Sequence, residues 1–146
     1  MASNLQFIKS ASAVDVSSIQ ITDCFTSAYD VYQVIFTNDN ASNNDLYVRV
    51  INDSGTVIST GSKYDYANLE MNSDASFGQN KNENFNEFRG IGFQALAGAG
   101  TVATFYAPYD SNSYTFATSE TSSFYQSGQM RGGKSIGIYK NADTIT

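Results

Sequence analysis

Residues 46–59 read LYVRVINDSGTVIS, and this stretch decides the fold class. Leu46, Val48 and Val50 recur with a period of two, which is the period of side chains on one face of a β-strand. Residues 52–55 (Asn-Asp-Ser-Gly) are strong turn formers, and the apolar pair after them continues in a second strand. The stretch from Leu46 to Thr60 therefore predicts a β-hairpin.

The same period of two recurs outward in both directions. We expect strands near residues 5–9, 14–21, 29–37, 88–96, 102–107, 114–118, 124–125 and 135–139. Residues 29–37 (YDVYQVIFT) are apolar on both faces, which predicts a central strand. Inside residues 14–21 the apolar residues change from even positions (Val14, Val16) to odd positions (Ile19, Ile21). This change indicates a β-bulge or bend at residues 17–18. Residues 63–71 suit a strand or a short helical turn, and residues 79–87 suit a loop or an edge strand.

These nine or ten short segments follow one another at turn spacings of about 8–15 residues, which is typical of a β-sandwich or barrel. We therefore predict one all-β domain over residues 1–146, an antiparallel β-sandwich of jelly-roll-like type. The last residues, 143–146, end on a strand-like pattern. That pattern leaves open whether the final strand pairs at an edge, whether the chain continues, or whether subunits exchange a strand.

The composition agrees with this fold class. A chain of 146 residues is long enough to bury a core as one domain. Charged residues make up only 15%, aromatic residues make up 14%, and Ser, Thr and Asn account for 45 positions. The chain is too aromatic for disorder and too poor in strong helix formers for a helical fold.

Several function classes are excluded by residues that the sequence lacks. There is no His, so a His general base, a Ser-His-Asp triad and a His-ligated metal are ruled out. The single Cys24 allows no intrachain disulfide and is best explained as a small buried hydrophobe. The net charge of −6 and the lack of a basic cluster argue against nucleic-acid binding. No apolar run reaches about 18 residues and no secretory signal opens the chain, so membrane insertion is not expected.

The acidic side chains are the only plausible catalytic groups. The candidates for a pair of glycosidase carboxyls are Asp65, Glu70, Glu83, Glu87 and Asp110. Their spacing does not aim two of them at one point, and solvated loop charges explain them better. We therefore predict no catalytic site and no cofactor, and hydrolysis of glycans is the least favoured hypothesis.

Two further groups of polar residues suggest weaker possibilities. Residues 39–45 gather side-chain oxygens that suit calcium, with Asp39, Asn43 and Asp45 as weak candidate ligands. The EF-hand order is not met, and Asx turns explain this run without a metal. Residues 131–134 (Arg-Gly-Gly-Lys) lack the spacing of a phosphate-binding loop, and we interpret them as a surface hairpin that pairs with carboxylates of a neighbour.

Tyrosines near predicted loops could form a sugar-binding face. The candidate ligand-binding residues are Tyr64, Tyr66, Tyr109, Asp110, Asn112 and Tyr114. Aromatic residues at strand spacing are more often core or cross-strand partners, and the chain has no Trp, the strongest platform for sugar stacking. Recognition of host surface glycans is therefore the alternative hypothesis rather than the first one.

Six sequence elements, taken in order and spacing, resemble a known group of proteins. They are NLQFIKS (residues 4–10), YDVYQVIF (29–36), LYVRVINDSG (46–55), SKYDYA (62–67), PYDSNSYTF (108–116) and RGGKSIGI (131–138). The chain is similar over nearly its whole length to small proteins of marine cyanobacterial tailed phages, which are described as virion structural or tail-fibre-like proteins. The shared elements are strand and turn sequences rather than catalytic signatures.

This resemblance implies a β-sandwich on the exterior of a virion and no active site. It implies capsid or tail proteins as partners, and a homo-oligomer as the working form. In that group the chain tends to continue with further strands after the segment that matches residues 137–146. A Ser-, Thr- and Asn-rich sandwich with net negative charge suits such a surface, because repulsion keeps particles from adhering to one another or to DNA.

Overall fold

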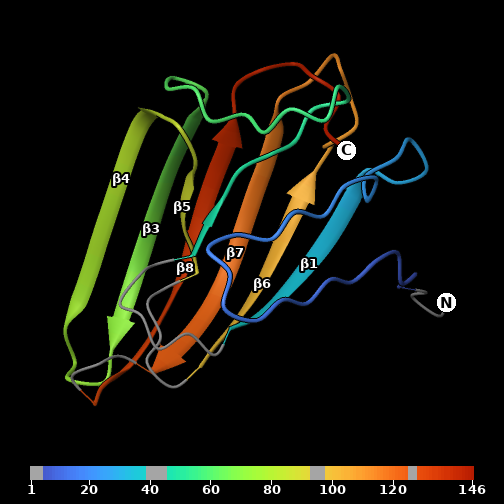
Figure 1. Ribbon diagram of the computed structural model, residues 1–146. Coiled ribbons are helices and arrows are strands. Elements are labelled where there is room, and N and C mark those ends of the chain that lie inside the picture. Colours follow the sequence, from blue (N-terminus) through green and yellow to red (C-terminus); the bar gives the residue numbers. More distant parts are fainter. Residues whose placement is uncertain (1–4, 39–45, 93–97, 125–127) are drawn as a thin grey trace, which may run out of the picture.

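The computed structural model describes residues 5–38, 46–92, 98–124 and 128–146, which form two antiparallel β-sheets (Figure 1). The larger sheet contains β1 (Val31–Asn38), β3 (Tyr64–Asn72), β4 (Phe77–Phe85), β6 (Ala99–Tyr106), β7 (Thr115–Phe124) and β8 (Met130–Tyr139). Their order across the sheet is β1-β6-β7-β8-β3-β4. The smaller sheet pairs β2 (Leu46–Val48) with β5 (Phe88–Gly92). The predicted all-β, antiparallel, sandwich-like fold is confirmed, with its strands divided six and two.

Alternation along β7 defines the two faces of the large sheet. From Thr115 to Phe124 every second residue is buried and the residues between them are exposed. We call the face that carries Thr115 and Ala117 the inner face and the opposite one, which carries Phe116, the outer face. The N-terminal segment and the connections around β2 and β5 cross in front of β6, β7 and β8 in Figure 1, so that view is from the inner side.

Aromatic rings form the core between β5 and the inner face. The Phe88 ring lies 4.9 Å from the Tyr64 ring and 6.3 Å from the Phe105 ring, and Tyr64 lies 5.2 Å from Tyr139. Phe88, Tyr64 and Tyr139 are fully buried. Gly137 on β8 permits this approach, because an added Cβ would lie 2.6 Å from Cδ1 of Phe88.

The N-terminal segment differs from the prediction, because residues 5–9 and 14–21 form no strand. Every residue from 5 to 20 is exposed, and no neighbouring strand pairs with the segment within the described residues. Asp15 and Asp23 have positive φ angles of 56° and 55°, so the extended backbone is interrupted at both. The period-two pattern was present, but a strand also needs a hydrogen-bonding partner.

The structure corrects three other predictions about strands. Residues 29–37 were expected to be central, but β1 is an edge strand of the large sheet. Residues 131–134 are not a hairpin, because they lie inside β8 and pair with both β7 and β3. Segments 114–118 and 124–125 were predicted as separate strands, but residues up to Phe124 belong to one continuous β7.

The remaining segments agree with one of the alternatives that the sequence allowed. Residues 63–71 are largely β3, and residues 79–85 belong to β4 at the other edge of the sheet. The 52–55 turn forms as predicted, with Gly55 at φ 76° and a bridge between Ile51 and Val57 beyond it. The predicted 46–60 hairpin is otherwise wrong, because β2 pairs with β5 and residues 56–60 form no strand. Ile145 is buried near the end of the chain and bridges to Asn52.

Candidate interaction surface

The outer face of the large sheet is unusually apolar for an exposed surface. It presents the following large side chains to solvent: Val31, Ile35, Leu69, Met71, Phe77, Val102, Tyr106, Phe116, Phe124, Met130 and Ile136. Exposure is 67% at Ile35, 64% at Leu69 and 63% at Ile136. Isolated apolar residues on a surface need no explanation, but a contiguous patch of this kind marks an interaction site.

The strand register places several of these residues side by side, with the polar row of Gln33, Thr104 and Thr118 between them. Val31 pairs with Tyr106, Tyr106 pairs with Phe116, and Phe116 pairs with Ile138, so four apolar residues lie in one row across four strands. Cross-strand partners of this kind have Cβ atoms about 5 Å apart, which is within contact distance. Further pairs on the same face are Ile35 with Val102, Met71 with Phe77, and Phe124 with Met130.

One ion pair lies in the middle of the outer face. Lys134 Nζ is 2.5 Å from Glu120 Oε1, and the two residues are register partners on β8 and β7. Their side chains are 71% and 69% exposed. An ion pair this exposed contributes little to the stability of one chain and leaves both charges available to a partner on this face.

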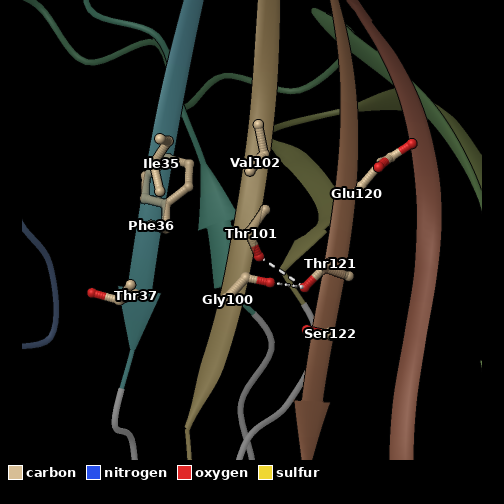
Figure 2. A pocket seen from close by; sticks show the side chains of 9 residues that line it. All are labelled: Ile35, Phe36, Thr37, Gly100, Thr101, Val102, Glu120, Thr121 and Ser122. Atoms are coloured by element: carbon tan, nitrogen blue, oxygen red, sulfur yellow. Dashed lines mark hydrogen bonds between the residues drawn. The ribbon is translucent and has the colours of Figure 1, made fainter. Parts of the chain in front are cut away.

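A shallow hollow of about 430 Å³ lies beside this pair on the outer face (Figure 2). It forms at Gly100, which contributes no side chain between Thr37 on β1 and Ser122 on β7, while Ile35 and Val102 lie next to it along the strands. A Cβ built at Gly100 would meet nothing within 4 Å. The outer face therefore combines apolar side chains with a gap of side-chain size.

Four of the five candidate carboxylates make separate contacts with basic or amide groups. Glu87 is buried, where it accepts hydrogen bonds from Arg49 Nη2 at 2.6 Å and Arg89 Nε at 3.0 Å. Glu70 accepts from Arg131 Nη2 at 2.5 Å. The positions of the others follow: Asp65 pairs with Lys140 at 2.8 Å, Glu83 is exposed on β4, and Asp110 accepts hydrogen bonds from Asn112.

Asp65 shows a shifted pKa that its surroundings explain. Partial desolvation of the carboxyl raises its pKa, but hydrogen bonds from the Lys140 ammonium and the Asn84 amide, with the charge of Lys140, outweigh this effect. The net result is a pKa below the usual range. A lowered carboxyl pKa suits an ion pair that fixes β3 against the end of β8, and it does not suit a general acid.

The tyrosine candidates are divided between the core and the surface. Tyr64 and Tyr66 are buried, so their rings are not available to stack on a sugar from solvent. Tyr109 and Tyr114 are exposed at 38% and 46%, on the loop that follows β6. Asp110 Oδ1 accepts hydrogen bonds from the backbone N–H and side-chain amide of Asn112, so both polar candidates close this loop's own turn.

The other candidates are placed as follows. Cys24 is half-buried and its thiol donates a weak hydrogen bond to the Ile21 carbonyl, while burial raises the pKa of this thiol. Asp39, Asn43 and Asp45 lie outside the described residues, as do residues 93–96 of the expected 88–96 strand. Across the described ranges no group of three His, Cys, Asp or Glu residues is placed to hold a metal ion.

Comparisons of the chain with known protein families, curated proteins and solved structures found no match. Among the described residues there is no helix with the length and apolar character needed to cross a membrane. The outer face is thus the feature of the molecule that most needs a functional explanation. Sequence reasoning did not identify it, although the apolar residues on both faces of residues 29–37 were its visible signal.

Proposed function

We propose that this chain is a non-enzymatic structural protein displayed on the exterior of a phage virion. It acts as a capsid decoration protein or as a module of a tail fibre or appendage, and it packs against other protein subunits through the outer face. The observation that carries this proposal is the apolar patch on that face. A patch that crosses the sheet and remains exposed in one chain has the character of a protein–protein interface.

The contacts of the acidic residues also support a structural role. Glu70, Glu87 and Asp65 are each held in an ion pair with a basic side chain. Such pairs fix strands and connections relative to one another, and they leave these carboxylates poorly suited to proton transfer. The resemblance to small virion proteins points in the same direction and supplies the particle exterior as the location.

Quantitative mass spectrometry of purified particles of the source phage tests this proposal. Copy numbers close to that of the major capsid protein would support a decoration role. A small fixed number per particle would support a tail appendage. Absence of the chain from washed particles would overturn both forms of the proposal.

Binding of host surface glycans is a second candidate, favoured by one observation. Tyr109 and Tyr114 expose their rings on a loop whose turn is already fixed by Asp110 and Asn112. Exposed aromatic rings on a rigid loop are suited to stacking against sugars. A glycan array should then show saturable binding that Tyr109→Ala or Tyr114→Ala removes, with Tyr106→Ala on the outer face as the matched control. Binding that survives both loop substitutions would contradict this candidate.

A further inference from the structure

We infer that the outer face binds the same face of a second copy of this chain, about a two-fold axis that runs along the strands between β7 and β8. This inference rests on the proposed assembly role of the outer face and names its partner. It follows from the strand order, the positions of charge, the apolar register and the hollow at Gly100, which are independent of one another.

The strand order gives the face a natural midline. The order β1-β6-β7-β8-β3-β4 leaves three strands on each side of the boundary between β7 and β8. We consider a two-fold axis that runs parallel to this boundary, midway between the outer faces of the two chains. It places β7 of one chain over β8 of the other. It also places β6 over β3 and β1 over β4, so every strand meets a partner strand and residues meet at equal levels.

The ion pair selects this axis over the alternative. Glu120 and Lys134 are register partners on either side of the midline, so the axis along the strands puts Glu120 of each chain opposite Lys134 of its partner. An axis across the strands at the same level would place Glu120 over Glu120 and Lys134 over Lys134. Opposite charges across an interface fix its register and like charges oppose it, so the first arrangement is favoured.

Several apolar residues obey the same symmetry, whereas Ile136 would lie over Thr118 and Ile35 over Gln79. Phe116 and Ile138 are register partners across the midline, and so are Phe124 and Met130. The axis therefore places Phe116 of one chain over Ile138 of the other, and Phe124 of one chain over Met130 of the other. One strand further out, Val102 is level with Glu120 and Leu69 is level with Lys134. Val102 of one chain therefore lies over Leu69 of the other. Each of these contacts occurs twice, as an isologous interface requires.

In this arrangement the hollow at Gly100, which Figure 2 shows in one chain, receives a side chain of the second chain. Gly100 is level with Ser122, Ser122 with Gly132, and Gly132 with Met71. The axis thus places Met71 of one chain, which is 53% exposed, over Gly100 of the other. Met is unbranched and fills irregular gaps well, and the site at Gly100 has free space for it.

The area of the face suits a stable dimer. Six strands spaced about 4.8 Å apart and 8–10 residues long give a face of roughly 24 Å by 30 Å, or about 700 Å². Specific interfaces bury about 800 Å² per partner. Two faces at the usual sheet separation of about 10 Å would bring their side chains into contact and add a second sandwich layer on the uncovered side.

The first test is the mass of the full chain in solution, measured by analytical ultracentrifugation over a range of concentrations. We expect a dimer that dissociates on dilution. Glu120→Lys and Lys134→Glu should each weaken the dimer at least about tenfold, because each makes all four facing charges alike. Both positions are strongly exposed, so the fold is retained. Asp53→Lys, in the exposed hairpin turn, makes the same change in net charge as Glu120→Lys and should leave the dimer intact.

Mixing the two charge variants separates contacts between chains from the ion pair within a chain. The within-chain pair is broken in both variants, but a heterodimer of Glu120→Lys with Lys134→Glu would pair opposite charges at every facing position. We expect the equimolar mixture to regain the dimer that neither variant forms alone. A mixture that remains monomeric would contradict contact between these two residues.

Cysteine crosslinking tests the direction of the axis. In a Cys24→Ser background, a short bismaleimide should join a Val102→Cys chain to a Leu69→Cys chain in crosslinked dimers, because residues facing each other across two packed sheets lie about 10 Å apart, too far for a direct disulfide. Neither chain should form them with itself, because identical positions would be three strands apart, roughly 14 Å. Self-crosslinking at equal efficiency would overturn the proposed axis.

The outcomes distinguish this inference from the proposed function. A chain that is monomeric at high concentration but present in virions would overturn the dimer and leave the virion role intact. A dimer that is absent from virions would do the reverse. Loss of self-association on deletion of residues 2–20, with no effect of the charge variants, would assign self-association to the N-terminal segment and overturn the face-to-face arrangement.

Discussion

Gly137 and Gly100 are both strand glycines of the large sheet, but an added methyl group would meet different surroundings at the two positions. At Gly137 the methyl carbon would lie 2.6 Å and 2.8 Å from two carbons of the buried Phe88 ring, which has no room to move. At Gly100 it would meet nothing within 4 Å. We expect Gly137→Ala to lower the free energy of unfolding by about 1–3 kcal/mol. Gly100→Ala should change it by less than about 0.5 kcal/mol.

Urea denaturation of both variants at low protein concentration measures this difference. Equal effects at the two positions would contradict the close contact between the Phe88 ring of β5 and Gly137 of β8.

Tyr64 predicts how stability depends on pH in the alkaline range. Burial raises the pKa of its phenol from the ordinary value of about 10 to about 12, although the Val50 amide and the charge of Arg49 oppose this shift. The unfolded chain therefore loses this proton first, so stability is complete below about pH 10 and falls as the pH rises towards 12. The loss amounts to about 2–3 kcal/mol by pH 12.

The Tyr64→Phe variant isolates this effect. It removes hydrogen bonds with Val50 N at 3.1 Å and Ile58 O at 2.9 Å, so at pH 7 it should be less stable by about 1–3 kcal/mol. Between pH 10 and 12 its free energy of unfolding should fall less steeply than that of the wild type, as measured by urea titration at each pH. Parallel curves for the two proteins would contradict the assignment to Tyr64.

Among the connections between elements, Glu87 links the two strands of the small sheet. It lies just before β5 and accepts hydrogen bonds from Arg49, beyond β2, and from Arg89 in β5. The Arg89 guanidinium also lies 4.6 Å from the Tyr47 ring centroid and 4.4 Å from the Phe85 ring centroid. One buried carboxylate therefore holds the segment at residues 47–49 against the segment at residues 85–89.

We expect Glu87→Gln to lower the free energy of unfolding by about 1–3 kcal/mol. The buried group loses two charge-assisted bonds, but both arginines are partly exposed, which reduces the cost below that of a fully buried pair. Chemical denaturation provides the measurement, with Glu83→Gln at an exposed position of β4 as the control. A variant as stable as the control would mean that Glu87 does not connect these segments.

The elements that sequence reasoning placed correctly share one physical property. The 52–55 turn and the strands β6 and β8 are specified locally, by turn formers and by apolar side chains at strand spacing. β7 was divided in two because its inner residues Ser119, Thr121 and Ser123 are small and polar, although they are buried. Residues 5–21 were predicted as strands because the pattern of a strand does not show whether a partner exists.

At the scale of the whole molecule, the two faces of the large sheet have unequal cover. β2, β5 and the connections bury the inner face, whereas Ile35, Leu69 and Ile136 of the outer face stay exposed. Apolar residues on both faces of a strand normally indicate a sheet covered on both sides. That is why residues 29–37 were predicted to be central. The sequence shows that these strands carry apolar side chains on both faces. Only the strand order and the burial of each residue show that one face stays uncovered in a single chain.

The N-terminal segment is the part of the molecule that the fold needs least. Residues 5–20 are exposed throughout, whereas Phe25 packs its ring 4.8 Å from Tyr32 and 5.8 Å from Phe105. The Tyr32 hydroxyl accepts from the Thr26 amide at 2.8 Å and donates to the Thr26 carbonyl at 2.7 Å. The chain is thus anchored from about residue 25 onward.

Deletion of residues 2–20 should therefore change the free energy of unfolding by less than about 0.5 kcal/mol, because exposed residues with few contacts contribute little. Phe25→Ala in the full chain should lower it by about 1–3 kcal/mol, since a partly buried ring loses less than the 3–5 kcal/mol of a fully buried one. Thermal and urea denaturation of both proteins give the two values. A large loss on truncation that grows with protein concentration would mean that the segment packs on a second chain, because only an intermolecular contact makes stability depend on concentration.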